Sequence, residues 1–180
     1  KGTLPSAQSA EILVNSAKDR AENTMIVDLL RNDLSKVCDY HSVKVPELCT
    51  LETFEGLHHL VSTVRGILAN NKTPLDVLRA CFPGGSITGA PKIRAMEIIE
   101  ELEPTRRGPY CGAMGYIGFN GRMDTNIAIR TLIYANNKAY LQTGSGIVSD
   151  SIPEKELQES LDKAAKIFES FDAPQKENAA

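Results

Sequence analysis

The sequence predicts an α+β fold in which antiparallel-rich sheets are flanked by helices. Two observations support this fold class. Apolar residues recur at helical spacing over residues 7–36 and again over 153–171, and a run of short β-rich segments with hairpin dipeptides lies between them. Helices that precede and follow an antiparallel run are typical of α+β proteins, not of doubly wound parallel sheets.

The first predicted helix covers residues 7–36, in which apolar residues recur at helical intervals: Ile12, Ala17, Ala21, Ile26, Leu29 and Leu30. Near its end, Asn32-Asp33 predicts either a bend or an inserted contact. Extended segments are expected next at residues 43–54, where Pro46 favours an edge strand, and at residues 59–68.

A short helix is predicted to begin after Thr73. Thr73 has the features of an N-cap, since Pro74 follows it and Asp76 falls in the first turn. The remaining elements are a loop over residues 82–89, a helix over 91–102, strands over 110–119, 126–135 and 138–143, and a final helix over 153–171. Asn120-Gly121 and Asn136-Asn137 are the expected hairpin turns.

Composition excludes several classes of protein. The 180 residues are 42% apolar and 24% charged, which is ordinary for a globular protein. A net charge of −3 without a basic stripe argues against nucleic acid or an anionic membrane as a partner. No membrane span or signal peptide is expected. Four widely spaced cysteines predict reduced thiols in a cytoplasmic protein: Cys38, Cys49, Cys81 and Cys111.

The segment FPGGSITGAPKIRAMEIIEELEP, residues 82–104, is the most specific motif of the chain. Gly84 and Gly85 allow backbone N–H groups to approach a ligand, and a loop that leads into a helix N-terminus can bind an anion. The alternative is a tight turn that caps a core helix. The segment resembles the PGGSITGAPK block of the chorismate-utilising enzymes, the family of anthranilate synthase and aminodeoxychorismate synthase component I. The resemblance implies the C-terminal part of their chorismate-binding fold.

Two pairs of carboxylates have helical spacing. Asp19 and Glu22 lie on the first helix, and Glu156 and Glu159 lie on the last. Each pair alone is explained by a solvated helix face, but four carboxylates on two helices could converge on a divalent cation. The resemblance implies Mg²⁺ between the two helices, with Glu22 and Glu159 as direct ligands and Asp19 and Glu156 holding metal-bound waters.

Several residues are candidates for binding carboxylates of a substrate. The turn at Gly144-Ser145-Gly146 offers backbone N–H groups, and Arg130, on a predicted strand, is equally consistent with a carboxylate fork or a structural ion pair. The resemblance implies a substrate site formed by the following residues: Thr88, Gly89, Tyr116, Arg130, Gly144, Gly146 and Lys163. It also places His59 beside the substrate ring as a catalytic residue, whereas His58 is expected to be structural.

Lys1-Gly2-Thr3 resembles the end of a Pro-Ile-x-Gly-Thr motif in which many aminodeoxychorismate synthases carry lysine at x and anthranilate synthases carry alanine. Residues 16–23 and 42–48 also resemble that branch. The resemblance implies that Lys1 is a nucleophile in amination of chorismate at C4, within 4-aminobenzoate and folate biosynthesis, with ammonia from a glutamine amidotransferase subunit. The alternatives are an anthranilate, isochorismate or salicylate synthase, and a substrate-binding fragment without turnover.

The chain is expected to be a piece of a longer polypeptide, because its first residues already belong to an interior motif. In the family, an upstream Ser-Pro-Glu segment supplies a proton donor to the leaving hydroxyl. The stretch over residues 5–9 is shorter than the usual loop of the family. Residues 1–172 are expected to form the C-terminal portion of the catalytic domain, and residues 173–180 a polar tail.

Overall fold

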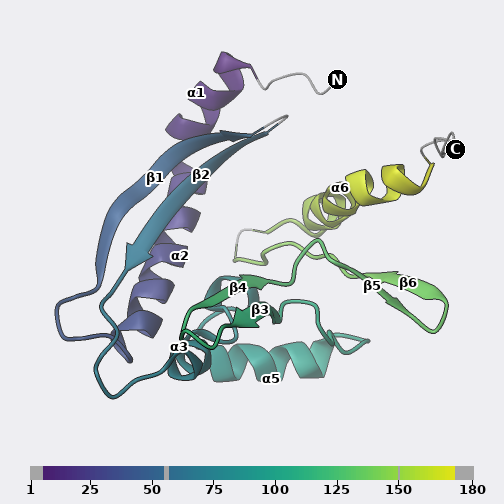
Figure 1. Cartoon of the computed structure of the whole chain (residues 1–180). Helices are drawn as coiled ribbons and strands as arrows, with labels where there is room; N and C mark the ends of the chain where they lie inside the picture. Colours follow the sequence, from purple (N-terminus) through teal and green to yellow (C-terminus); the bar gives the residue numbers. More distant parts are fainter. Residues whose placement is uncertain (1–5, 55–56, 150, 173–180) are drawn as a thin grey trace, which may run out of the picture. The chain divides into compact units, whose positions relative to one another are not determined.

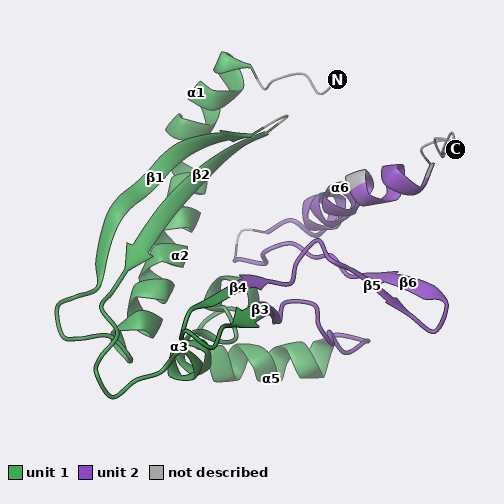
Figure 2. Ribbon diagram, in the orientation of Figure 1, with its two compact units in different colours: residues 1–102, 116–124 green, residues 103–115, 125–180 purple. Residues whose placement is uncertain are grey.

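The computed structural model describes residues 6–54, 57–149 and 151–172, without the side chains of Lys166 and Asp172 (Figure 1). The chain divides into two compact units (Figure 2). Unit 1 comprises Lys1–Leu102 and Tyr116–Asp124, and unit 2 comprises Glu103–Gly115 and Thr125–Ala180. The predicted polar tail lies outside the described residues.

The predicted α+β class is confirmed. Among the described residues there are six helices and six strands, and the strands pair as three two-stranded sheets, β1–β2, β3–β4 and β5–β6. The elements in chain order are α1 (Ala7–Asn15), α2 (Ala17–Ser35), β1 (Lys44–Phe54), β2 (Leu57–Arg65), α3 (Pro74–Cys81), α4 (Gly85–Thr88), α5 (Lys92–Leu102), β3 (Ala113–Ile117), β4 (Met123–Ile127), β5 (Leu132–Ala135), β6 (Lys138–Leu141) and α6 (Pro153–Asp172).

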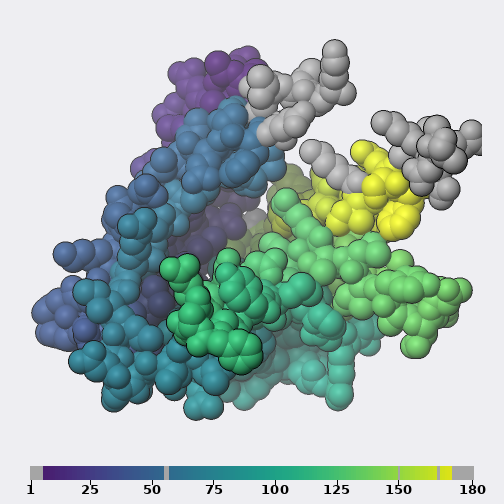
Figure 3. All heavy atoms as spheres, in the orientation of Figure 1, coloured from purple at the N-terminus to yellow at the C-terminus, as the bar shows by residue number. Residues whose placement is uncertain are grey.

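Helix α2 is the centre of unit 1. It lies along the twisted β1–β2 ribbon and also packs against α3 and α4 (Figure 1). Strands β1 and β2 pair antiparallel from Lys44↔Arg65 to Phe54↔Leu57, with register shifts on either side of Glu47. The core of the unit includes three buried side chains, Val27, Val37 and Cys49. The outer surface of the ribbon presents side chains of β1 and β2 to solvent, the blue spheres in Figure 3.

The prediction of a single helix over residues 7–36 is wrong, because one helix ends and another begins at Ser16. The Ser16 N–H donates to the Leu13 carbonyl and ends α1, while its side-chain oxygen accepts from the Asp19 N–H and begins α2. The helix is not interrupted at Asn32-Asp33, since α2 continues to Ser35. The alternative, an inserted contact, is confirmed: Asp33 is buried and forms ion pairs.

The predicted start of the third helix is confirmed. The Thr73 side chain accepts from the Asp76 N–H, and the Asp76 carboxylate accepts from the Thr73 N–H, so the two residues form a capping box. The Thr73 hydroxyl also donates to Asp76 Oδ2 at 2.8 Å, and this hydrogen bond, followed by the one from the Thr73 N–H, lowers the pKa of Asp76.

The strand predicted over residues 126–135 is interrupted. Strand β4 ends at Ile127, β5 begins at Leu132, and Arg130 lies between them with a φ of 50°. Arg130 is therefore not on a strand, since a positive φ is incompatible with extended backbone. The turn between β5 and β6 is confirmed, because Asn136 and Asn137 have φ values of 52° and 58°, which suit a two-residue hairpin turn.

Across the described part of the chain, no helix is both long and apolar enough to cross a membrane.

Candidate functional site

The glycine-rich segment of unit 1 forms a helical turn where an open loop was expected. Residues Gly85–Thr88 make the short helix α4, and the N–H groups of Ile87, Thr88 and Gly89 donate to carbonyls of Gly84 and Gly85. Those three N–H groups are thus already bonded. The Thr88 hydroxyl donates to the Gly84 carbonyl at 3.2 Å. The tight-turn alternative describes this segment better than an open anion nest.

Gly85 and Gly89 of this segment require glycine for different structural reasons. Gly85 is buried against α2, and a Cβ built there would lie 3.3 Å from Leu29 Cδ1. The absence of a side chain therefore allows α4 to approach α2 closely. Gly89 has a φ of 102°, which L-residues with side chains rarely adopt. It ends α4 and directs the chain toward α5.

Lys92, in the same motif, forms an ion pair that sequence reasoning missed. Its Nζ lies 2.6 Å from Asp33 Oδ2 and 3.3 Å from the carbonyl oxygens of Ala80 and Cys81. The opposite carboxylate oxygen of Asp33 accepts from Lys36 Nζ at 2.9 Å. A signal for this pair exists in the sequence: a cation at the start of a helix and an anion at the end of another each oppose the dipole of their own helix, so each needs a partner.

In unit 1, the predicted metal carboxylates Asp19 and Glu22 lie one turn apart on α2, and both are exposed. The predicted catalytic residue His59 lies on β2, half-buried, with its ring edge-on to Phe54 at 5.7 Å. His58 points to the other face of the ribbon, as successive strand residues do. Its Nδ1 contacts Thr53 Oγ1 at 2.9 Å and its Nε2 contacts the Ser6 carbonyl at 3.3 Å, in agreement with a structural role.

In unit 2, the structure brings three predicted residues together. Lys163 Nζ lies 3.1 Å from the Gly144 carbonyl oxygen and 2.7 Å from Glu159 Oε1. One turn earlier on α6, the Ser160 carbonyl accepts from the Thr143 hydroxyl at 3.0 Å. These bonds fix the glycine turn, residues 144–146, against the helix that carries the second pair of predicted metal carboxylates. Glu156 lies one turn before Ser160 and is half-buried.

The four predicted metal carboxylates are divided between the two units, with Asp19 and Glu22 in unit 1 and Glu156 and Glu159 in unit 2. Among the residues that the structure describes, no group of three or more His, Cys, Asp or Glu side chains could hold a metal ion. The oxygen donors suit Mg²⁺ chemically, because a hard divalent cation prefers carboxylates and retains waters.

Tyr110 lies beside the glycine turn and was not predicted. A Cβ at Gly144 would lie 3.3 Å from Tyr110 Oη, and the Arg107 guanidinium lies 5.6 Å from the Tyr110 ring centre. Burial, assisted by Cys111, raises the pKa of Tyr110 to about 12, so its hydroxyl is protonated at neutral pH. Hydrogen bonding to Glu103 raises the pKa of Arg107.

The other predicted substrate-binding residues have fewer contacts with the rest of the described chain. Tyr116 is 62% exposed on β3 and belongs to unit 1. Arg130 is exposed at its bend in unit 2, and no ion pair is found for it among the described residues, so the structural ion-pair alternative has no support. A Cβ added at Gly146 would meet no atom within 4 Å. Lys1 lies outside the described residues.

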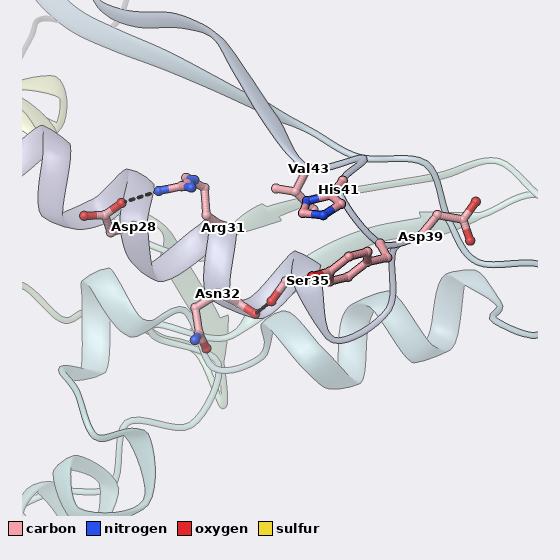
Figure 4. A pocket seen from close by; sticks show the side chains of 8 residues that line it. Asp28, Arg31, Asn32, Ser35, Asp39, His41 and Val43 are labelled. Carbon is pink, nitrogen blue, oxygen red and sulfur yellow. Dashed lines mark hydrogen bonds and ion pairs between the residues drawn. The ribbon is translucent and has the colours of Figure 1, made fainter.

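A hollow of about 480 Å³ lies elsewhere on unit 1, at the C-terminal part of α2 and the turn that follows it (Figure 4). Arg31 pairs with Asp28 across one helical turn at 2.9 Å. The lining residues are Asp28, Arg31, Asn32, Ser35, Asp39, Tyr40, His41 and Val43. None of the predicted site residues lines this hollow, so it is distinct from the candidate site.

A comparison with known protein families identifies the family of this chain. Residues 1–169 match the family described as chorismate binding enzyme. The chain belongs to the chorismate binding enzyme family. The resemblance seen in the glycine-rich motif, and the fold that it implied, are thereby confirmed.

Individual relatives within the chorismate binding enzymes agree. Aminodeoxychorismate synthase component 1 of Escherichia coli (strain K12) is 54% identical over 179 residues, which are 96% of this chain and 40% of the relative. Anthranilate synthase component 1 of Synechocystis sp. is 52% identical over 171 residues, 92% of this chain and 34% of the relative. The crystal structure of anthranilate synthase component I from Streptococcus pneumoniae TIGR4 superposes with a TM-score of 0.83 at 45% identity, covering 89% of this chain and 37% of that one.

The chain thus spans about 40% of the length of the aminodeoxychorismate synthase relative that it matches.

Proposed function

We propose that the chain is the chorismate-binding part of an enzyme that aminates chorismate at C4 to give 4-amino-4-deoxychorismate, for 4-aminobenzoate and folate biosynthesis. The observation that carries the proposal is the 54% identity to an aminodeoxychorismate synthase component 1 across 96% of the chain. Lys1-Gly2-Thr3 supports it, because the anthranilate branch has alanine in place of this lysine.

In the proposed reaction, the Lys1 amine is the nucleophile. Its nitrogen bonds to ring C2 of chorismate, both ring double bonds shift, and the C4 hydroxyl takes a proton from the upstream donor of the family and leaves as water. Ammonia then adds at C4 and loses a proton, the double bonds shift back, and the C2–N bond to Lys1 breaks to release the product. Attack requires a neutral amine, so the site must lower the pKa of Lys1 by burial or by nearby positive charge.

Arg130, Lys163 and the glycine turn are proposed to bind the substrate carboxylates, and Thr88 and Gly89 are proposed to contribute to the same substrate site. The Lys163 ammonium contacts both Glu159 and the Gly144 carbonyl, so it connects a proposed metal ligand to the proposed substrate-binding turn. Glu22 and Glu159 would hold Mg²⁺, supported by Asp19 and Glu156. When bound, the ion would act as a Lewis acid on the ring carboxylate.

Ammonia is proposed to come from a glutamine amidotransferase subunit. The designation "component 1" of the aminodeoxychorismate synthase relatives supports a partner subunit.

The four cysteines are free thiols, which supports a reducing compartment such as the cytoplasm.

Anthranilate synthesis is the second candidate, favoured by the 52% identity to an anthranilate synthase component 1. Incubation of the full-length protein with chorismate, Mg²⁺ and ammonium salts, followed by mass spectrometry of the products, separates the two. We expect 4-amino-4-deoxychorismate. Formation of anthranilate would favour the second candidate, and chorismate binding without any product would indicate a binding fragment.

A further inference from the structure

The ammonium of Lys92 joins three helices of unit 1. Asp33 lies in the last turn of α2, the Ala80 and Cys81 carbonyls end α3, and Lys92 begins α5. All of these groups lie within 3.3 Å of Lys92 Nζ. A lysine ammonium has three N–H donors, so these three acceptors use its full capacity. Lys92 therefore has no donor left for a substrate, although it belongs to the most specific motif of the chain.

The contacts close the segment that contains the motif. Residues 82–91 leave α3 at Cys81 and enter α5 at Lys92, and the Lys92 ammonium holds both ends at one point. Fixing the ends of a loop reduces the conformations available to the residues between them. Thr88 and Gly89 lie within this closed segment, and α4 is additionally packed on α2 through Gly85 and Leu29.

Burial makes the loss of either partner of the Asp33–Lys92 ion pair costly. The Asp33 side chain is 5% exposed and that of Lys92 is 20% exposed. A buried charge that loses its partner is strongly disfavoured, so the pair either forms as a unit or the local structure rearranges. The contact also offsets two unfavourable placements, an anion at the end of α2 and a cation at the start of α5.

We propose that Asp33 and Lys92 are positioning residues: their ion pair, with the two α3 carbonyls, holds residues 82–91 in the conformation that presents Thr88 and Gly89 to chorismate. The proposal rests on the proposed function for its ligand. It assigns no direct substrate contact to Lys92.

The test compares Lys92→Met with Lys36→Met in the full-length protein. Lys36 pairs with the same carboxylate at 2.9 Å but is 53% exposed and holds no part of the segment, so Lys36→Met is the matched control. We expect Lys92→Met to exchange the amides of Thr88 and Gly89 about tenfold faster and to bind chorismate about tenfold more weakly. Lys36→Met should stay within about twofold of the parent in both, because Lys36 is half exposed, and Asp33 keeps its ion pair with Lys92 in that variant.

Lys92→Arg keeps a cation and several donors, so it should recover most of both losses. If Lys92→Met does not fold, Lys92→Gln retains two donors for the carbonyls and replaces it in the comparison. Amide exchange and chorismate affinity that match the Lys36→Met control would overturn the proposal. If the parent itself does not bind chorismate, the proposed function fails, while the exchange of residues 82–91 still decides whether the pair holds the segment.

Discussion

Lys163 on α6 holds the carbonyl oxygen of Gly144 at 3.1 Å, so the helix and the glycine turn of unit 2 are joined by a charged hydrogen bond. The same ammonium lies 2.7 Å from Glu159. A change at Lys163 is therefore expected to affect the turn and the carboxylate together.

Replacing Lys163 by Met should weaken chorismate binding by about tenfold or more, because a charge-assisted bond of about 1.5–3 kcal/mol is lost. Isothermal titration calorimetry on the full-length protein measures the effect. Lys155→Met, an exposed lysine on the same helix, is the control and should bind like the parent. Equal affinities for the two variants would limit Lys163 to a structural role.

Gly144→Ala should destabilise the protein by about 1 kcal/mol, because the new Cβ would lie 3.3 Å from Tyr110 Oη and one of them must move. Tyr110→Phe in the same chain should recover part of the loss, since it removes that oxygen. Gly146→Ala, where the added Cβ meets nothing within 4 Å, should change the free energy of unfolding by less than about 0.5 kcal/mol. Denaturant unfolding compares the three variants, and equal effects of both alanines would contradict the crowding argument.

The pKa of Tyr110, raised to about 12, predicts a dependence of stability on alkaline pH. An unfolded tyrosine has a pKa of about 10, so between about pH 10 and 12 the unfolded state loses a proton that the folded state keeps. The contribution of Tyr110 to stability is therefore complete below about pH 10 and is lost as pH rises toward 12. The ultraviolet absorbance of tyrosinate should show a step near pH 12 that is missing in Tyr110→Phe; persistence of that step would assign it elsewhere.

Glu22→Gln and Glu159→Gln should each raise the Mg²⁺ concentration needed for half-maximal activity by about tenfold or more, because each keeps the side-chain shape and removes the charge. Glu154→Gln, an exposed carboxylate in the first turn of α6, is the control. The readout is a Mg²⁺ titration of product formation. An unaltered Mg²⁺ requirement in both site variants would remove the two-helix metal site.

With ammonia withheld, the full-length protein should gain the mass of chorismate less one water on Lys1. Peptide mapping after incubation with chorismate and Mg²⁺ locates the adduct. Lys1→Ala should show no adduct and far slower amination, while still binding chorismate, because the proposed carboxylate contacts do not involve Lys1. An adduct on another residue would identify a different nucleophile.

Local rules were sufficient for part of the fold. Thr73 caps α3 through its own neighbours, and Asn136-Asn137 adopts the positive φ values that a two-residue turn requires, so both could be predicted from a few adjacent residues. The break at Ser16 is also local, but serine at the end of one helix and the start of the next is hard to distinguish from serine within a helix. The positive φ at Arg130 has no signal in its side chain, since arginine has no preference for that conformation.

The motif residues of the candidate site could be named from the sequence, but their contacts could not. Gly85 was expected to expose backbone to a ligand, yet it allows close packing on Leu29, a contact between residues far apart in sequence. The bond between Asp33 and Lys92 spans 59 positions, and no local rule connects them. Tyr110 lies against Gly144, although strands β3 to β6 separate the two in the chain. Each of these contacts depends on tertiary packing.

The two-strand width of the β1–β2 ribbon has a practical consequence for work on this segment by itself. Within the described residues, each strand has a hydrogen-bonding partner on one side only, and the exposed apolar side chains of Leu48, Phe54 and Leu57 lie along the ribbon. Such an edge can add a strand from a second molecule, and Pro46 and Glu47 oppose this at one end of β1 only. Isolated preparations of the segment should therefore self-associate more readily as concentration rises, and charged substitutions along β1 would be the first means of keeping them dispersed.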